Sequence, residues 1–106
     1  MEAFEFKFGP WSNPSQLSNK KPTIVGVVGS GNLEVLVEEV DLNGCTQFSL
    51  ETSIDGFKKT WQAVLSDFAE QEQFANTIIT INDGGATPAV VQLRLAQAAQ
   101  QWKETT

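Results

Sequence analysis

Two apolar runs separated by four small residues constrain the fold of this chain more than any other feature. The runs cover residues 24–28 and 33–37, and the stretch between them reads Gly29-Ser30-Gly31-Asn32. Because glycine lacks a Cβ and tolerates positive φ, this pattern predicts two strands joined by a four-residue hairpin loop. The loop would present the hydroxyl of Ser30 to solvent. The residues alone leave two interpretations of Ser30, a simple turn residue or a place where a group is attached.

The first half of the chain otherwise has the periodicity of strands. Phenylalanines alternate with other residues over 3–8, which predicts a half-buried strand. An exposed loop is expected over 11–22, with Lys20-Lys21 solvated near its end. Further strands are predicted over 23–28, 33–40 and 46–53. Asn43-Gly44 is a strong hairpin signal, so we expect the second to fourth strands to form an antiparallel meander.

The periodicity changes to that of helices in the second half. Large apolar residues recur at helical spacing over 56–72, and Asp55 is placed to cap the first turn. The β-branched run 77–81 predicts a fifth strand. Thr87-Pro88 has the pattern of a helix N-cap followed by proline. The buried face of this second helix is predicted to carry Val91, Leu95, Ala98 and Trp102.

These elements predict the α+β class. We expect one domain over 1–106, with a mostly antiparallel sheet of about five strands and two helices packed on one face. The helix over 56–72 and its flanking strands are expected to form a right-handed βαβ crossover.

Charge and residue content exclude several classes of function. Seven Lys and Arg oppose thirteen Asp and Glu, and the formal charge of −6 argues against binding to nucleic acid or to an anionic membrane surface. The chain has no His and a single Cys, Cys45, so it lacks the commonest general base and a multi-cysteine metal site. We therefore expect no catalytic residue and no metal ligand. The acidic N-terminus has no signal-peptide pattern, which predicts a cytoplasmic protein.

Two glycine-containing segments raise the question of phosphate binding. Gly29-x-Gly31 is followed by a predicted strand and not by a helix, so it does not match a dinucleotide-binding loop. The segment 83–88 leads into the second helix. It is either an ordinary strand-to-helix connection with capping, or its backbone N–H groups face an anionic group, and both can hold together.

Several separated blocks of the sequence resemble one known family, the acyl carrier (delta) subunit of biotin-independent malonate decarboxylase. The blocks occur in the same order and cover most of the chain from about residue 24 onward. They are 27–36, 52–57, 61–65, 81–88 and 90–98, and the first contains Val28-Gly29-Ser30-Gly31-Asn32.

The resemblance implies a covalent prosthetic group. In that family the serine of the Gly-Ser-Gly turn, Ser30 by position, is joined through a phosphodiester to 2′-(5″-phosphoribosyl)-3′-dephospho-CoA, with Gly29 and Gly31 beside it. The thiol of the group carries acetyl and malonyl units while malonate is converted to acetate and CO2. The implied partners are the acyltransferase (alpha) subunit, the decarboxylase (beta and gamma) subunits, a malonyl transferase and a prosthetic-group transferase.

Under this interpretation the chain is a non-catalytic carrier. The missing His and the lone Cys agree with that role, because the reactive thiol would belong to the prosthetic group. Two alternatives stay open: a carrier subunit of the citrate lyase type, which uses the same group, and a non-catalytic binding or assembly domain.

Overall fold

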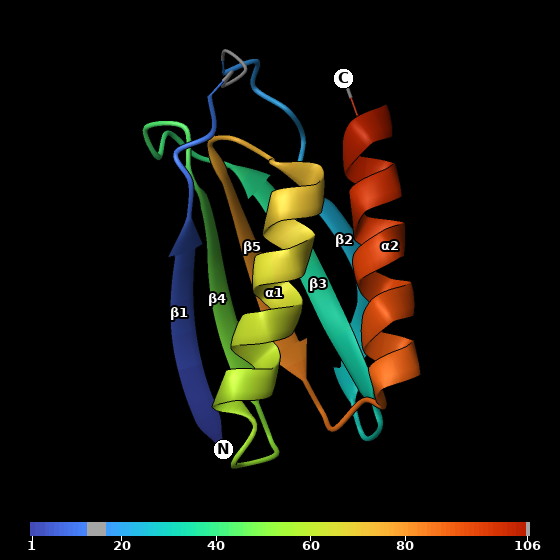
Figure 1. The fold of residues 1–106 in the computed structure, drawn as a ribbon. Helices are drawn as coiled ribbons and strands as arrows, with labels where there is room; N and C mark the ends of the chain where they lie inside the picture. The colour runs from blue at the N-terminus through green and yellow to red at the C-terminus, as the bar shows by residue number, and fades with distance from the viewer. Residues whose placement is uncertain (13–16, 106) are drawn as a thin grey trace.

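The computed structural model describes residues 1–12 and 17–105, so part of the predicted loop, residues 13–16, lies outside the described residues. One five-stranded sheet and two helices make up the fold, which is α+β as predicted. The strands are β1 (Glu2–Phe8), β2 (Thr23–Gly29), β3 (Asn32–Glu39), β4 (Thr46–Thr52) and β5 (Thr77–Asp83), and the helices are α1 (Lys58–Glu72) and α2 (Pro88–Glu104). Both helices lie on the same face of the sheet (Figure 1).

The order of strands across the sheet is β1-β4-β5-β3-β2. Three neighbouring pairs are antiparallel, and the β4–β5 pair at the centre is parallel. The sheet is therefore mixed, and the prediction of a mostly antiparallel sheet is corrected accordingly. The predicted βαβ crossover is confirmed, because α1 joins the parallel neighbours β4 and β5.

The predicted meander of the second to fourth strands is wrong. Asn43 and Gly44 do adopt positive φ, as their sequence suggests, but the turn joins strands that are not neighbours. β5 lies between β3 and β4, and Asn76 just before it holds the turn. Its side-chain oxygen accepts hydrogen bonds from the N–H groups of Leu42 (3.0 Å) and Gly44 (2.8 Å). A turn signal specifies local backbone conformation, whereas partner choice depends on residues much later in the chain.

The core lies between the sheet and the two helices. Its buried strand residues come from alternate positions, as in β3, and Phe6 of β1 is among them, which confirms the alternation predicted over 3–8. Helix α1 contributes Trp61, Leu65 and Ala69, and α2 contributes the predicted Val91, Leu95, Ala98 and Trp102 together with Ala99. Neither of these helices is long and apolar enough to cross a membrane.

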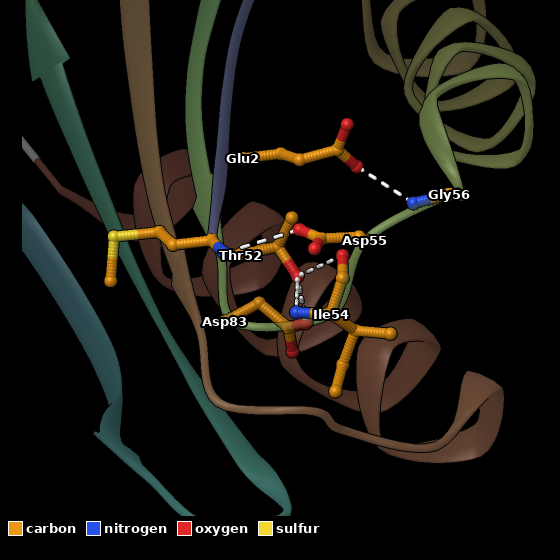
Figure 2. A network of polar contacts seen from close by, with 7 residues as sticks. Glu2, Thr52, Ile54, Asp55, Gly56 and Asp83 are labelled. Carbon is orange, nitrogen blue, oxygen red and sulfur yellow. Dashed lines mark hydrogen bonds and ion pairs between the residues drawn. The ribbon is translucent and has the colours of Figure 1, made fainter.

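The two helices begin differently. Thr87 caps α2 as predicted, with its hydroxyl accepting a hydrogen bond from the Val90 N–H (3.3 Å). The predicted cap of α1 is wrong, because Phe57 occupies that position and makes no side-chain cap. The Asp55 carboxylate pairs instead with the Met1 amino group (3.1 Å), beside a hydrogen bond from the Gly56 N–H to Glu2, as Figure 2 shows.

Lys20 is not the solvated loop residue that the sequence suggests. Its ammonium group donates a hydrogen bond to the Trp102 carbonyl (2.8 Å) near the end of α2 and lies 4.2 Å from the centre of the Trp102 ring. Burial lowers the pKa of Lys20, and the nearby Glu39 carboxylate partly opposes that shift. A cation near a helix C-terminus is favourable, because the last carbonyl groups carry partial negative charge.

Truncating Phe48 tests the packing of the core. Phe48 is fully buried and contacts the rings of Phe8 and Phe68 edge-on. We expect Phe48→Ala to lower the free energy of unfolding by about 3 to 5 kcal/mol, since it removes buried surface and leaves a cavity. Phe57→Ala is the control, because Phe57 is 50% exposed, and it should change stability by about 0.5 kcal/mol or less. Urea unfolding measures both, and equal losses would contradict the described core.

Candidate functional site

Ser30 lies in the turn between β2 and β3, where the sequence places it. The loop is shorter than predicted: Gly29 and Asn32 are paired across the hairpin, which leaves Ser30 and Gly31 as a two-residue turn. Gly31 has φ +73°, a value that glycine adopts without strain. The four-residue loop expected from the sequence is corrected on this point, because Gly29 and Asn32 continue their strands.

The surroundings of Ser30 are open. Gly29, Ser30 and Gly31 are all exposed, and a Cβ placed on either glycine would meet no atom within 4 Å. Nothing therefore hinders the approach of a bulky group to the Ser30 hydroxyl from the solvent side. The geometry suits an attachment point, and an ordinary turn would be exposed in the same way.

What distinguishes this turn is that it is fastened to a second loop. The Gly31 N–H donates to the Gly84 carbonyl (2.9 Å), and the Gly84 N–H donates to the Asn32 carbonyl (2.8 Å). The backbones approach so closely that a Cβ on Gly84 would overlap the Gly29 carbonyl. The structure thus brings together the two glycine-containing segments that the sequence singled out separately. Main-chain hydrogen bonds hold the turn from behind, and its outer side stays free.

The loop between β5 and α2 is in turn organised by Asp83. This buried carboxylate accepts hydrogen bonds from the Thr52 hydroxyl and the Ala86 N–H, both at 2.9 Å, and the first of these is drawn in Figure 2. The interpretation of 83–88 as a capped strand-to-helix connection is confirmed. An anionic group facing the start of α2 stays a prediction.

Arg94 is a residue of the site that sequence reasoning missed. Its Nε donates to the side-chain oxygen of Asn32 (3.3 Å), so the arginine reaches from α2 to the base of the Ser30 turn. Its side chain crosses β2 at Gly26, where a Cβ would lie 3.1 Å from Cδ and Nε of Arg94. A glycine inside a strand is a known sign of close approach by another group, and Gly26 carried that signal.

An apolar pocket of about 340 Å³ opens on the other side of the same loop. It lies between the start of α1 and the start of α2, and its lining includes Ile54, Phe57, Trp61, Ala86 and Val91. Phe57 and Ile54 at its mouth are about half exposed. The sequence did not predict this pocket, which forms between helices that are distant along the chain.

Within the described residues, neither the cysteine nor a set of metal-binding side chains lies at the Ser30 turn. Cys45 is buried just before β4, at the end of the sheet away from Ser30. Within residues 1–12 and 17–105, no three side chains of the His, Cys, Asp or Glu type come together as metal ligands. The site consists of an exposed hydroxyl, main-chain hydrogen bonds and one arginine.

Comparison with known proteins identifies the family. The model of the malonate decarboxylase delta subunit (MdcD) family matches residues 20–102. The malonate decarboxylase acyl carrier protein of Burkholderia cepacia is 50% identical over 101 residues, covering 95% of this chain and 90% of that protein. That of Acinetobacter calcoaceticus is 48% identical over 99 residues, covering 93% and 96%. The chain belongs to the malonate decarboxylase delta subunit family.

A solved structure agrees with this assignment. A chain in the crystal structure of a Pseudomonas malonate decarboxylase hetero-tetramer in complex with malonate is 35% identical, with a TM-score of 0.78, over 95% of this chain and 98% of that one. The matched region of the delta subunit family contains the Ser30 turn, the Gly84 loop and Arg94. The residues matched by the family model therefore include the whole of the site described above.

The close approach at Gly84 generates a test of the fastened turn. Gly84→Ala should lower the free energy of unfolding by about 1 to 3 kcal/mol, because its Cβ would collide with the Gly29 carbonyl. Gly29→Ala is the matched control and should change stability by about 0.5 kcal/mol or less, since its Cβ enters open space. Urea unfolding compares the two variants. Equal stability of both would show that the turn and the loop are not tightly packed.

Proposed function

We propose that this chain is the acyl carrier subunit of a malonate decarboxylase and that Ser30 is its attachment residue. The observation that carries the proposal is an exposed serine on a fastened turn, in a chain similar over almost its whole length to proteins named as such carriers. A carrier needs an accessible hydroxyl and a firm base beneath it. Ser30 and the Gly84 hydrogen bonds meet both needs.

The proposed group is 2′-(5″-phosphoribosyl)-3′-dephospho-CoA, linked through a phosphodiester. The residues fit it: the space beside Gly29 and Gly31 admits a phosphate, and no large side chain has to move. In forming the link, the Ser30 hydroxyl would lose its proton as its oxygen bonds to phosphorus and the leaving group of an activated donor departs. When bound, the group supplies the thiol that carries acetyl or malonyl units.

This chain's own part in the reaction is positioning. The exposed hydroxyl is the fixed point of the arm, and the β-hairpin behind it is immobilised by β5 and the Gly84 loop. A rigid base confines the arm to a defined region of space and so raises the concentration of its thiol at a partner's active site. We propose that the chain is non-catalytic and that all bond-breaking in malonate takes place on other subunits.

The proposed partners follow from this role. They are the acyltransferase (alpha) and the decarboxylase (beta and gamma) subunits, a malonyl transferase and the prosthetic-group transferase, all in the cytoplasm. The hetero-tetrameric state of the Pseudomonas enzyme supports a multi-subunit setting. An acidic carrier of formal charge −6 suits successive, exchangeable contacts with basic surfaces. The relatives favour malonate decarboxylase over a carrier of the citrate lyase type.

Intact mass tests the attachment. The protein isolated from its native host should include a fraction heavier by one phosphoribosyl-dephospho-CoA group, because Ser30 is the exposed acceptor. Ser30→Ala should lack that fraction, and the reconstituted complex should then release CO2 from malonate only at background rate.

Ser53→Ala is the control, since Ser53 is also exposed but lies outside the turn, and it should be modified normally. Modification of Ser30→Ala would disprove the assignment, and a fully active Ser30→Ala complex would disprove the carrier function.

A further inference from the structure

Arg94 lies directly behind the Ser30 turn. Its Nε is 3.3 Å from the side-chain oxygen of Asn32, and Asn32 follows Ser30 by two residues. Two residues span at most about 7 Å of chain. The guanidinium therefore lies at the base of the turn that carries Ser30. Gly26 makes this placement possible, because any larger residue there would press against Arg94 and against the Leu33 carbonyl.

The positive charge of Arg94 is not used by the fold. The two ion pairs within the described residues join Met1 to Asp55 and Lys103 to Glu72, and neither involves Arg94. Among the described residues, its side-chain hydrogen bonds go to amides, namely the side chain of Asn32 and the Gln97 side-chain oxygen, to which Nη1 donates at 2.9 Å. The guanidinium is half-buried and has no carboxylate partner within residues 1–12 and 17–105, so it keeps several N–H donors for another acceptor.

The lysines whose contacts are described lie elsewhere. Arg94 is the sole arginine of the chain. Lys20 and Lys103 lie near the C-terminal end of α2, where they contact Trp102 and Glu72, and Lys58 lies over the ring of Phe4 on β1. In a chain of formal charge −6, the one guanidinium is thus at the one exposed turn that carries a candidate attachment serine.

The start of α2 adds to the positive potential at this end. The helix begins at Pro88 and has no acidic residue in its first turn, so its own sequence does not neutralise the partial positive charge of its N-terminus. The Gly84 loop connects this helix start to the Ser30 turn. Figure 1 shows the β2–β3 turn and the beginning of α2 at the same end of the molecule. Of these two features the Arg94 guanidinium is the more important for an anion at Ser30, because the Asp83 carboxylate already accepts a hydrogen bond from the Ala86 N–H beside the helix start.

We propose that Arg94 binds the phosphodiester that joins the prosthetic group to Ser30, and so sets the direction in which the arm leaves the turn. This inference rests on the proposed function. A planar guanidinium offers paired N–H groups that match the oxygens of a phosphate, which a flexible lysine ammonium does not. Asn32 would hold Arg94 at its Nε and Gln97 at one N–H of Nη1, which leaves the remaining Nη N–H groups for the phosphate. Arg94 is in this sense a positioning residue.

The single arginine makes a direct test possible. In an ¹H–¹⁵N spectrum of the full chain, Arg94 gives one Nε–H signal and Trp11, Trp61 and Trp102 give three indole signals. Between the unmodified and the modified chain, we expect the Arg94 Nε–H signal to shift, because the guanidinium gains an anionic neighbour, and the hydrogen exchange of the Nη N–H groups to slow by about tenfold or more. That factor corresponds to about 1.4 kcal/mol, the lower end of what a hydrogen bond to a charged group contributes.

The tryptophans are internal controls. Trp11 and Trp102 lie away from the turn and should be unchanged, whereas Trp61 lines the apolar pocket near the Gly84 loop. A shift of Trp61 with no change at Arg94 would mean that the arm lies in the pocket, and it would overturn the proposal. An unchanged Arg94 signal alone would also overturn it. The mass of the same sample distinguishes failure of the proposed function from failure of the Arg94 proposal. Without an adduct on Ser30 the proposed function fails, and the Arg94 proposal fails with it.

A variant pair gives an independent readout. In the modified chain, Arg94→Gln should move the ³¹P signal of the phosphodiester and leave the pyrophosphate signals of the dephospho-CoA part in place. Lys103→Gln, which removes a cation from the far end of the same helix, should move neither. Arg94→Lys, which keeps the charge without the paired donors, should restore the signal only in part. An identical phosphodiester signal in Arg94→Gln and the natural chain would disprove the contact.

Discussion

The pairing of β5 with β4 on one side and β3 on the other is the constraint on which the rest of this structure depends. In the described sheet, β5 lies between two antiparallel pairs of strands, β1–β4 and β2–β3, and joins them. Its parallel register with β4 requires the long crossover through α1, and its antiparallel register with β3 brings the end of β5 to the beginning of β3. Buried isoleucines at 79 and 81 provide the apolar face that this central position demands.

The candidate site follows from the same register. Leu33 is paired with Asp83, so the next residue, Gly84, comes to lie against Asn32 and the turn before it. A shift of β5 by two residues would keep every side chain on its proper face of the sheet but would remove the main-chain bonds behind Ser30. The buried Asp83 carboxylate secures the register at this end, since its partners Thr52 and Ala86 belong to β4 and to the α2 connection. Strand pairing thus determines whether Ser30 is held firmly or only exposed.

The local features were predictable from the sequence because their causes are local. Alternation over 3–8, helical spacing over 56–72 and the Thr87-Pro88 start of α2 each arise from neighbours in the chain, and each is confirmed. Partner choice was not predictable in this way. Asn43-Gly44 correctly predicted a turn with positive φ. The strand pairing inferred from it was wrong, because β5 lies between β3 and β4 and Asn76 holds the turn. The Asp55 cap failed for a similar reason: its carboxylate pairs with the amino group of Met1, at the start of the neighbouring strand β1.

The candidate site also contains one part that is predictable from local sequence and another that depends on contacts between distant segments. Ser30 and its two glycines could be identified from the sequence, since small residues at a turn are a local pattern. Arg94 could not, because 62 residues separate it from Asn32 and their contact exists only once α2 packs over β2 and β3. The absence of a Cβ at Gly26 and at Gly84 makes sense only with those partners in place. A carrier of the proposed kind needs few reactive groups of its own. Its function depends instead on the close approach of the Gly84 backbone to the turn and on the position of the Arg94 charge. These are the properties that depend most on the completed fold.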